Sequence, residues 1–122
     1  MRMGDRQMQT FTITAADLDA DGFYIGQTDV TNCDGHVEIA ANLGWVKFRA
    51  GIRATGRIRA LAGSGLEAGE GIEVGEGIEA GSGLEAGRGI KAGWGIKAGW
   101  GIKAGEGIKA GEGIKAGEGI KA

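Results

Sequence analysis

Very few residues of this 122-residue chain have the side chains and the spacing that catalysis would need. The sequence has one histidine, His36, and one cysteine, Cys33. We find no Ser/His/Asp set, no zinc spacing and no phosphate loop. The Gly-X-Gly steps do not form a dinucleotide site, because they lack the strand–helix context that such a site needs. We therefore expect a protein that is not an enzyme and has no cofactor.

Three aspartates at alternate positions, Asp17, Asp19 and Asp21, precede Gly22 and match the first half of a calcium-binding loop. Such a loop has a bidentate glutamate at its twelfth position, which is Thr28 in this sequence. The three aspartates are the candidate metal site of the chain. The alternative interpretation is an acidic turn.

The elements that must position any binding residue follow from a six-residue repeat. From Gly65 onward the sequence repeats Gly-(Ile/Leu)-(Glu/Lys)-(Ala/Val)-Gly-X, and the register extends back to Val46 with a two-residue insertion near Leu61. Two apolar residues separated by a charged one are typical of a short strand with one buried face. We expect the glycines to form corners, because glycine reaches φ > 0 without a Cβ clash.

A single β-solenoid of stacked short parallel strands accounts best for this pattern, and the predicted fold class is all-β. Three-residue strands are too short for an antiparallel meander, whereas stacked coils pair their backbones and bury the apolar residues inside. Three hexads per coil would give a triangular turn, and two hexads would give a flattened one. The alternative is a disordered tail, which the regular isoleucine spacing disfavours.

We predict two parts, an N-terminal cap with irregular first coils over residues 1–45 and the hexad-repeat solenoid over residues 46–122. Looser apolar pairs within the cap indicate further strands at Phe11/Ile13, Phe23/Ile25 and Val37/Ile39. The broader first coil is expected to be filled by aromatic side chains, namely Phe11, Phe23, Tyr24, Trp45 and Phe48.

Glycine accounts for 27 residues of the chain and proline for none, and 20 of the glycines lie from Gly63 onward. This bias excludes a conventional globular core or a helix bundle in that half, and the glycine spacing excludes collagen.

The lone cysteine favours a reducing compartment. The first residues lack the apolar run that is typical of a signal peptide, and no stretch approaches the roughly 20 apolar residues of a membrane span. We expect a cytoplasmic protein without a membrane partner.

The net charge of −2 conceals four segments of alternating sign. Residues 1–45 carry two bases and seven acids, 46–60 five bases, 61–86 six acids, and 87–122 seven bases and three acids. In a solenoid these segments become bands along the axis. The acidic belt consists of Glu67, Glu70, Glu73, Glu76, Glu79 and Glu85. One hypothesis is that this belt imitates the phosphates of a nucleic acid and so binds the basic groove of a nucleic-acid-binding protein. The other is that the Arg/Lys band contacts the phosphates of a nucleic acid directly. The alternative interpretation is that these outward side chains are charged only to keep the protein soluble.

Trp94 and Trp100 stand at the X position of two consecutive hexads, where most other residues are polar. We expect both indoles to project from corners as anchors for a partner, since tryptophan is enriched among binding hot spots. The alternative is that they lie flat over glycine-bared backbone. The predicted partner-binding residues are therefore the acidic belt together with Trp94 and Trp100.

The hexad, with one aliphatic residue in six and small residues beside it, resembles the left-handed β-helix of hexapeptide-repeat proteins. That family favours a small residue two positions before the aliphatic one, where this chain has Glu70, Ser82, Arg88 or Trp94. The pattern also resembles polymerising bactofilin-type β-helices and glycine-rich hexad proteins of phages. Hexapeptide-repeat acyltransferases use a histidine base, but His36, beside a turn and without a cluster of catalytic partners, is interpreted as structural.

These resemblances imply a protein that acts by binding. The first hypothesis is a phage-type inhibitor, similar to small anti-CRISPR proteins in size and charge banding, that blocks a protein in the host cytoplasm. The alternative is a bactofilin-like structural protein whose acidic first end and basic last end attract each other. Such a homo-oligomer would polymerise head to tail through unpaired strand edges.

Overall fold

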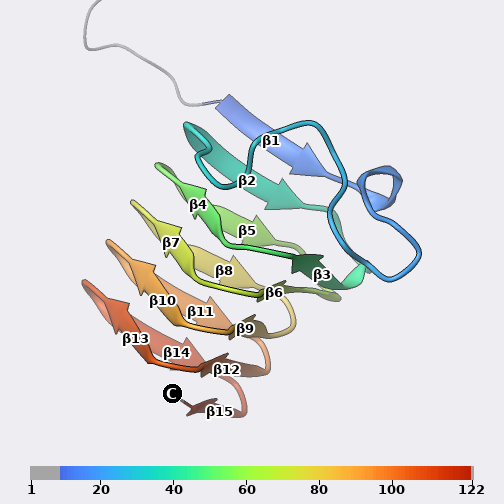
Figure 1. Ribbon diagram of the computed structural model, residues 1–122. Helices are drawn as coiled ribbons and strands as arrows, with labels where there is room; N and C mark the ends of the chain where they lie inside the picture. The colour runs from blue at the N-terminus through green and yellow to red at the C-terminus, as the bar shows by residue number, and fades with distance from the viewer. Residues whose placement is uncertain (1–8, 122) are drawn as a thin grey trace, which may run out of the picture.

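The computed structural model describes residues 9–121, which form a triangular β-solenoid of about five turns (Figure 1). Residues 1–8 and Ala122, the last alanine of the repeat, lie outside the described residues. The predicted all-β solenoid of parallel strands is confirmed. Each regular coil takes three hexads, so the triangular alternative is the one adopted.

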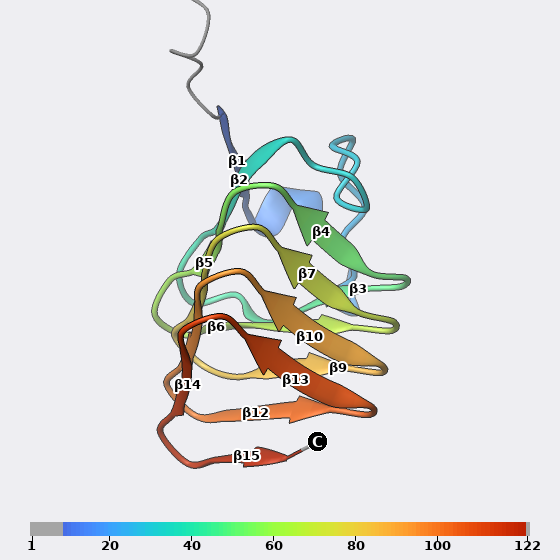
Figure 2. The same cartoon turned by 90° about the vertical axis from the view of Figure 1, so that its left-hand side faces the viewer.

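Three parallel sheets form the three faces of the coil (Figure 2). Face 1 consists of β1 (Gln9–Ile13), β2 (Gly35–Ile39), β5 (Ile58–Ala60), β8 (Ile78–Ala80), β11 (Gly95–Ala98) and β14 (Gly113–Ala116). Face 2 consists of β3 (Gly44–Phe48), β6 (Ser64–Ala68), β9 (Leu84–Ala86), β12 (Gly101–Ala104) and β15 (Gly119–Lys121). Face 3 consists of β4 (Ile52–Ala54), β7 (Ile72–Val74), β10 (Gly89–Ala92) and β13 (Gly107–Ala110). A 3₁₀ turn, η1 (Ala15–Asp17), follows β1.

The coils become shorter and more regular toward the C-terminal end. The register partners on face 1 move closer together in the sequence at each step, from Phe11 with Val37 to Val37 with Ile58 and then Ile58 with Ile78. From β8 onward every step is three hexads. The insertion predicted near Leu61 makes the coil between β5 and β8 longer than these, and Gly63 within it has a φ of 81°.

Alternation along each short strand builds the core. In β7, Ile72 and Val74 are buried and Glu73 points outward, and most hexad strands show the same pattern. Ile72, Ile78 and Leu84 are each no more than 2% exposed, and every one stacks on an aliphatic residue of the next coil. Burial of each such side chain stabilises the fold by about 1.5–3 kcal/mol.

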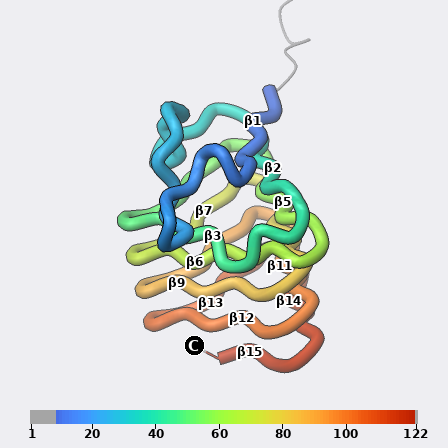
Figure 3. Tube along the Cα trace, turned by 90° about the vertical axis from the view of Figure 1, so that its right-hand side faces the viewer, coloured from blue at the N-terminus to red at the C-terminus, as the bar shows by residue number. Residues whose placement is uncertain are grey.

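The irregular first coil belongs to the solenoid rather than lying beside it. The N–H of Tyr24 donates to the carbonyl of Lys47, and the N–H of Cys33 donates to that of Arg53. Short parallel bridges at these points extend faces 2 and 3 above β3 and β4. Figure 3 shows this segment above the ladder of face 2. The first coil therefore covers the apolar interior at the N-terminal end.

The aromatic residues of the cap fill the first coils only in part. Phe48 is buried, and Phe11 and Tyr24 are half-buried against the core, as predicted. Trp45 is 36% exposed, so the expectation that it fills the coil is wrong. The reason is register: the alternation that buries Val46 and Phe48 turns Trp45 to the outside of face 2.

The predicted strand pair Phe23/Ile25 is also wrong in its orientation. Ile25 is 59% exposed. Phe23 lies on the outside, where the charged groups of Lys47 and Arg49 stand 5.5 and 4.2 Å from the centre of its ring. Cation–π contact thus holds this ring where the sequence pattern suggested core packing.

The hexad glycines are required for close packing and not, as expected, for positive φ. In the described part of the chain, positive φ values occur only before the regular repeats, at Gly22, Gly35, Asn42, Gly44 and Gly63. A Cβ placed on Gly81 would lie 2.6 Å from the carbonyl oxygen of Leu61, and one on Gly93 would overlap that of Gly75. Each corner thus brings two backbones closer than any side chain permits.

Candidate functional site: the tryptophan coil

One coil, residues 88–104, carries the most exposed aromatic surface of the repeats, and we name it the tryptophan coil. Trp94 and Trp100 are 54% and 53% exposed and stand at the two ends of β11 on face 1. Both indoles therefore project from corners, as predicted. The other outward residues of this coil are all basic: Arg88, Lys91, Lys97 and Lys103.

Each tryptophan corner continues a column of corner residues from coil to coil. The N–H of Trp94 donates to the carbonyl of Glu76 at 2.9 Å, and the N–H of Glu112 donates to the carbonyl of Trp94 at 2.7 Å. Trp94 thus lies between two glutamates. Trp100 lies between Ser82 and Glu118 in the same way. Ser82 is buried, so the X position does not always face water as predicted.

A groove of about 380 Å³ runs along face 2 beside Trp100. Its floor is formed by backbone, because three glycines in register, Gly83, Gly101 and Gly119, leave the strands without side chains there. Trp45 stands at the N-terminal end of the groove and Trp100 along one side. Its charged lining consists of Glu85, Lys103, Glu118 and Lys121.

The indole of Trp45 already lies over the upper part of this glycine column. A Cβ built on Gly65 would be 3.2 Å from Cε3 of Trp45, and one built on Gly83 would be 2.9 Å from Cη2. The ring therefore covers backbone that two neighbouring glycines leave bare. The flat packing considered for Trp94 and Trp100 is thus the arrangement of the third tryptophan.

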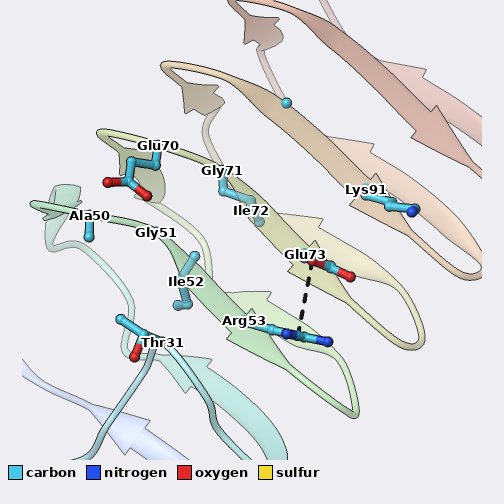
Figure 4. Close-up of a pocket in the computed structure, with 11 residues that line it drawn as sticks. Thr31, Ala50, Gly51, Ile52, Arg53, Glu70, Gly71, Ile72, Glu73 and Lys91 are labelled. Atoms are coloured by element: carbon cyan, nitrogen blue, oxygen red, sulfur yellow. Dashed lines mark ion pairs between the residues drawn. The ribbon is translucent and has the colours of Figure 1, made fainter.

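Face 3 has a comparable hollow of about 370 Å³ without any aromatic side chain (Figure 4). Gly51 and Gly71 leave its backbone bare, and Arg53 and Glu73 form an ion pair of 4.0 Å across neighbouring strands. A hollow over glycines is therefore a general feature of the repeat. The tryptophans make the face-2 groove different.

The predicted acidic belt encircles the rod. Glu79 points outward from face 1, Glu67 and Glu85 from face 2, and Glu73 from face 3, with Glu70 and Glu76 at corners between them. No single face presents more than a part of it. A partner that contacts one face therefore meets two or three of these carboxylates.

Part of the belt's charge is opposed by the coil above. Arg59 lies 3.4 Å from Glu79 across neighbouring strands of face 1, and both side chains are about half exposed. Arg53 pairs with Glu73 in the corresponding position on face 3. Such exposed pairs contribute less than about 1 kcal/mol each, but they reduce the negative potential that a partner meets.

The three aspartates of the candidate calcium loop do not form a ligand cluster. No group of three or more metal-ligating side chains occurs in residues 9–121. Oδ1 of Asp19 accepts hydrogen bonds from the N–H groups of Asp21 and Phe23, both at 2.9 Å, and Oδ2 of Asp17 accepts one from Thr14. The N–H of Phe23 is the main cause that lowers the pKa of Asp19. These carboxylates thus organise turns.

His36 and Cys33 have structural contacts. Nδ1 of His36 accepts a hydrogen bond from the N–H of Arg57 at 3.0 Å. The thiol of Cys33 is buried inside the first coil, where Cys33 bridges to Ala54 of β4, and this burial raises its pKa. In neither case do the contacts resemble an activated base or nucleophile.

Trp45 and the glycine groove were missed by the sequence reasoning. The signal was present, because Trp45 alternates with Val46 and Phe48 and so had to face outward.

In comparisons with family models, curated proteins and solved structures, none matches this chain. Among residues 9–121, no helix is long and apolar enough to cross a membrane.

Proposed function

We propose that this protein acts by binding another macromolecule through face 1, between Trp94 and Trp100. The observation that carries the proposal is the exposure of both indoles at the two ends of one strand. A tryptophan contributes a large apolar area to an interface, and tryptophans are enriched among the residues whose truncation costs most affinity. Anchors fixed on a rigid strand also lose little entropy on binding.

The charges around these anchors fit a partner with a basic groove at one end of the contact. Glu76 lies directly above Trp94 and Glu79 lies on β8, while Lys97 and Lys115 follow on β11 and β14. A basic groove would therefore lie toward the N-terminal side of Trp94. Its basic groups would meet the two members of the acidic belt that this face presents.

Under this proposal the protein is a non-enzymatic inhibitor of the phage type, similar in mode of action to anti-CRISPR proteins. It would block a nucleic-acid-binding protein by occupying the groove that nucleic acid uses. The contacts of His36 and Cys33 are consistent with a binding function, since both side chains serve the fold.

The test uses the full chain, immobilised and exposed to a bacterial extract, followed by titration of each purified captured protein. Trp94→Ala and Trp100→Ala are each expected to weaken binding at least tenfold, because a hot-spot tryptophan contributes about 2 kcal/mol or more. Glu106→Ala is the matched control, since it changes an exposed corner residue in the column that has no tryptophan.

Binding that survives the double variant Trp94→Ala/Trp100→Ala, with an unchanged circular dichroism spectrum, would refute the proposal. Loss of binding in Glu106→Ala as well would also count against it, because the effect would then not be specific to the tryptophan corners. We also expect the nucleic acid that the captured protein binds to compete with this chain for the same groove.

A further inference from the structure

The glycine column of face 2 is occupied in its upper half and open in its lower half. Trp45 covers Gly65 and Gly83, as the Cβ distances of 3.2 and 2.9 Å to its ring show. Gly101 and Gly119 continue the same column in register below. A Cβ on Gly119 would meet nothing within 4 Å. The position of Trp45 shows that an indole ring fits flat on this glycine column. The lower half of the column, at Gly101 and Gly119, has space for a second ring.

The open half of the groove has Trp100 and Glu118 on one side and Lys103 and Lys121 on the other, and Glu85 is the register partner of Lys103 toward the N-terminal end. Trp100 stands at the side of Gly101, and its indole is more than half exposed. On the other side Lys103 and Lys121 are register partners on neighbouring strands, so their Cα atoms are about 5 Å apart. Neither lysine forms an ion pair within the described part of the chain. Two adjacent like charges favour an acidic ligand group between them.

The Trp94 corner of the same chain has the complementary chemistry. Its indole is 54% exposed, and Glu76 and Glu112 lie directly above and below it in the corner column. Trp94 is therefore a tryptophan corner with a glutamate corner on each side of it along the axis. Trp100 lacks this arrangement, because the residue above it is the buried Ser82.

We infer that the occupant of the open groove is the Trp94 corner of a second copy of this chain. The indole of Trp94 would lie on Gly101 and Gly119 beside Trp100, as Trp45 lies on Gly65 and Gly83. Glu76 and Glu112 would then face Lys103 and Lys121. The inference does not rest on the proposed partner of face 1.

This association joins two different surfaces, a corner on one copy and a groove on the next. Each copy keeps one free corner and one free groove, so the contact is heterologous and leads to a closed ring or an open chain of molecules. It also covers both exposed tryptophans. A partner that binds face 1 would therefore compete with self-association.

The test measures the size of the purified full chain by sedimentation velocity at increasing protein concentration. The wild-type chain is expected to form a concentration-dependent series of oligomers. Trp94→Ala removes the inserted ring, and Gly119→Leu places a side chain in the groove at a position where a Cβ meets nothing within 4 Å. Each variant alone is expected to be monomeric. An equimolar mixture of the two is expected to form a dimer and nothing larger, because only one pair of intact surfaces remains.

Gly107→Leu is the matched control, since Gly107 occupies the same hexad position on face 3 and also has nothing within 4 Å of its Cβ. It should assemble like the wild-type chain. A wild-type chain that stays monomeric at millimolar concentration would overturn the inference. Oligomers that persist in both Trp94→Ala and Gly119→Leu would also overturn it and would indicate end-to-end stacking of coils instead.

Discussion

The first coils and the regular repeats reach the same triangular cross-section by different means. In residues 9–64 the coils are long, and side chains such as Asp19, Ser64 and Tyr24 hydrogen-bond to backbone groups that the irregular turns leave unpaired. In the described residues after Ser64, the side chains make no such hydrogen bonds. There the fold depends on backbone pairing between coils, on stacked aliphatic residues and on corners that admit only glycine.

The difference explains where binding residues can be placed. In the repeats the outward side chains make at most exposed ion pairs, as Glu73 and Glu79 do, so charge and aromatic groups can vary there at little cost to the fold. In the first coils several polar side chains, such as Asp17, Asp19 and Asp29, are already engaged in turns. A binding surface is therefore more readily built on the tryptophan coil than on the acidic loops of the cap.

The largest effect is expected from the stacked core of the repeats. Ile96 is 2% exposed and lies in register between Ile78 and Ile114. Ile96→Ala should destabilise the fold by about 2–5 kcal/mol, because it leaves a cavity that coils above and below cannot close. Ile25→Ala, at an exposed position of the first coil, should change stability by less than about 0.5 kcal/mol. Urea unfolding followed by circular dichroism measures both, and equal effects would contradict the assignment of the core.

The next contrast is between the two glycine positions of the hexad, the corner position of Gly93 and the strand position of Gly113 in the last coil of face 1. A Cβ on Gly93 would overlap the carbonyl oxygen of Gly75, whereas one on Gly113 meets nothing within 4 Å. Gly93→Ala should therefore destabilise by about 1–3 kcal/mol or more through forced separation of two coils. Gly113→Ala should be neutral or slightly stabilising, since alanine reduces the entropy of the unfolded chain. Thermal melts of the two variants compare the positions directly, and similar melting temperatures would refute the close-packing account.

The repeats could be read from the sequence because their pattern is periodic and local. Spacing of Ile72, Ile78 and Leu84 fixes which side of each strand is buried, and the parallel stack follows from strand length. The coil size could not be read, because a coil of two hexads and a coil of three hexads show the same periodicity. It is settled by which backbones pair, as between Ile72 and Ile90.

The first coil and the groove resisted prediction for a different reason. The outward position of Phe23 depends on cations that reach it from β3 and the residue that follows, and the groove depends on Trp45 lying over Gly65 and Gly83 of the next two coils. Both contacts join residues from different coils. A sequence pattern records which face a residue occupies, but it contains no information about its neighbour across the stack.

In the first coils a buried serine hydroxyl hydrogen-bonds to two backbone groups, one N–H and one carbonyl, of the coil above. Ser64 is fully buried, and its hydroxyl accepts a hydrogen bond from the N–H of Leu43 at 3.0 Å and donates to the carbonyl of Ala40. Ser64→Ala should destabilise by about 1–2 kcal/mol, because both backbone groups lose their partner. Ser82→Ala, at the same corner one coil below, is the control and should have a smaller effect. Urea midpoints test this, and a larger loss for Ser82→Ala would contradict it.

Cys33 allows the cap to be tested by pH. Burial raises the pKa of its thiol above the ordinary value of 9.0, and the carboxylates of Asp34 and Asp29 act in the same direction. The unfolded chain therefore ionises this thiol at lower pH than the folded chain. The stability contributed by the neutral thiol is complete below about pH 9 and is lost as the pH rises through the folded value. Unfolding midpoints at pH 7.5 and 10 should show this loss, and Cys33→Ala should remove the thiol's part of it.

The smallest effect is expected at the ion pairs that join the acidic belt to the coil above. Glu79 lies 3.4 Å from Arg59 and is also in register with Lys97 below, so it stands between two cations. Because both members of the pair are about half exposed, a double-mutant cycle with Arg59→Gln and Glu79→Gln should give a coupling of only about 0.2–1 kcal/mol that falls with added salt. A coupling well above this range would mean that the belt serves mainly to hold the coils together. In that case its glutamates would have a structural task, and the contrast between engaged first coils and free repeats would no longer hold for face 1.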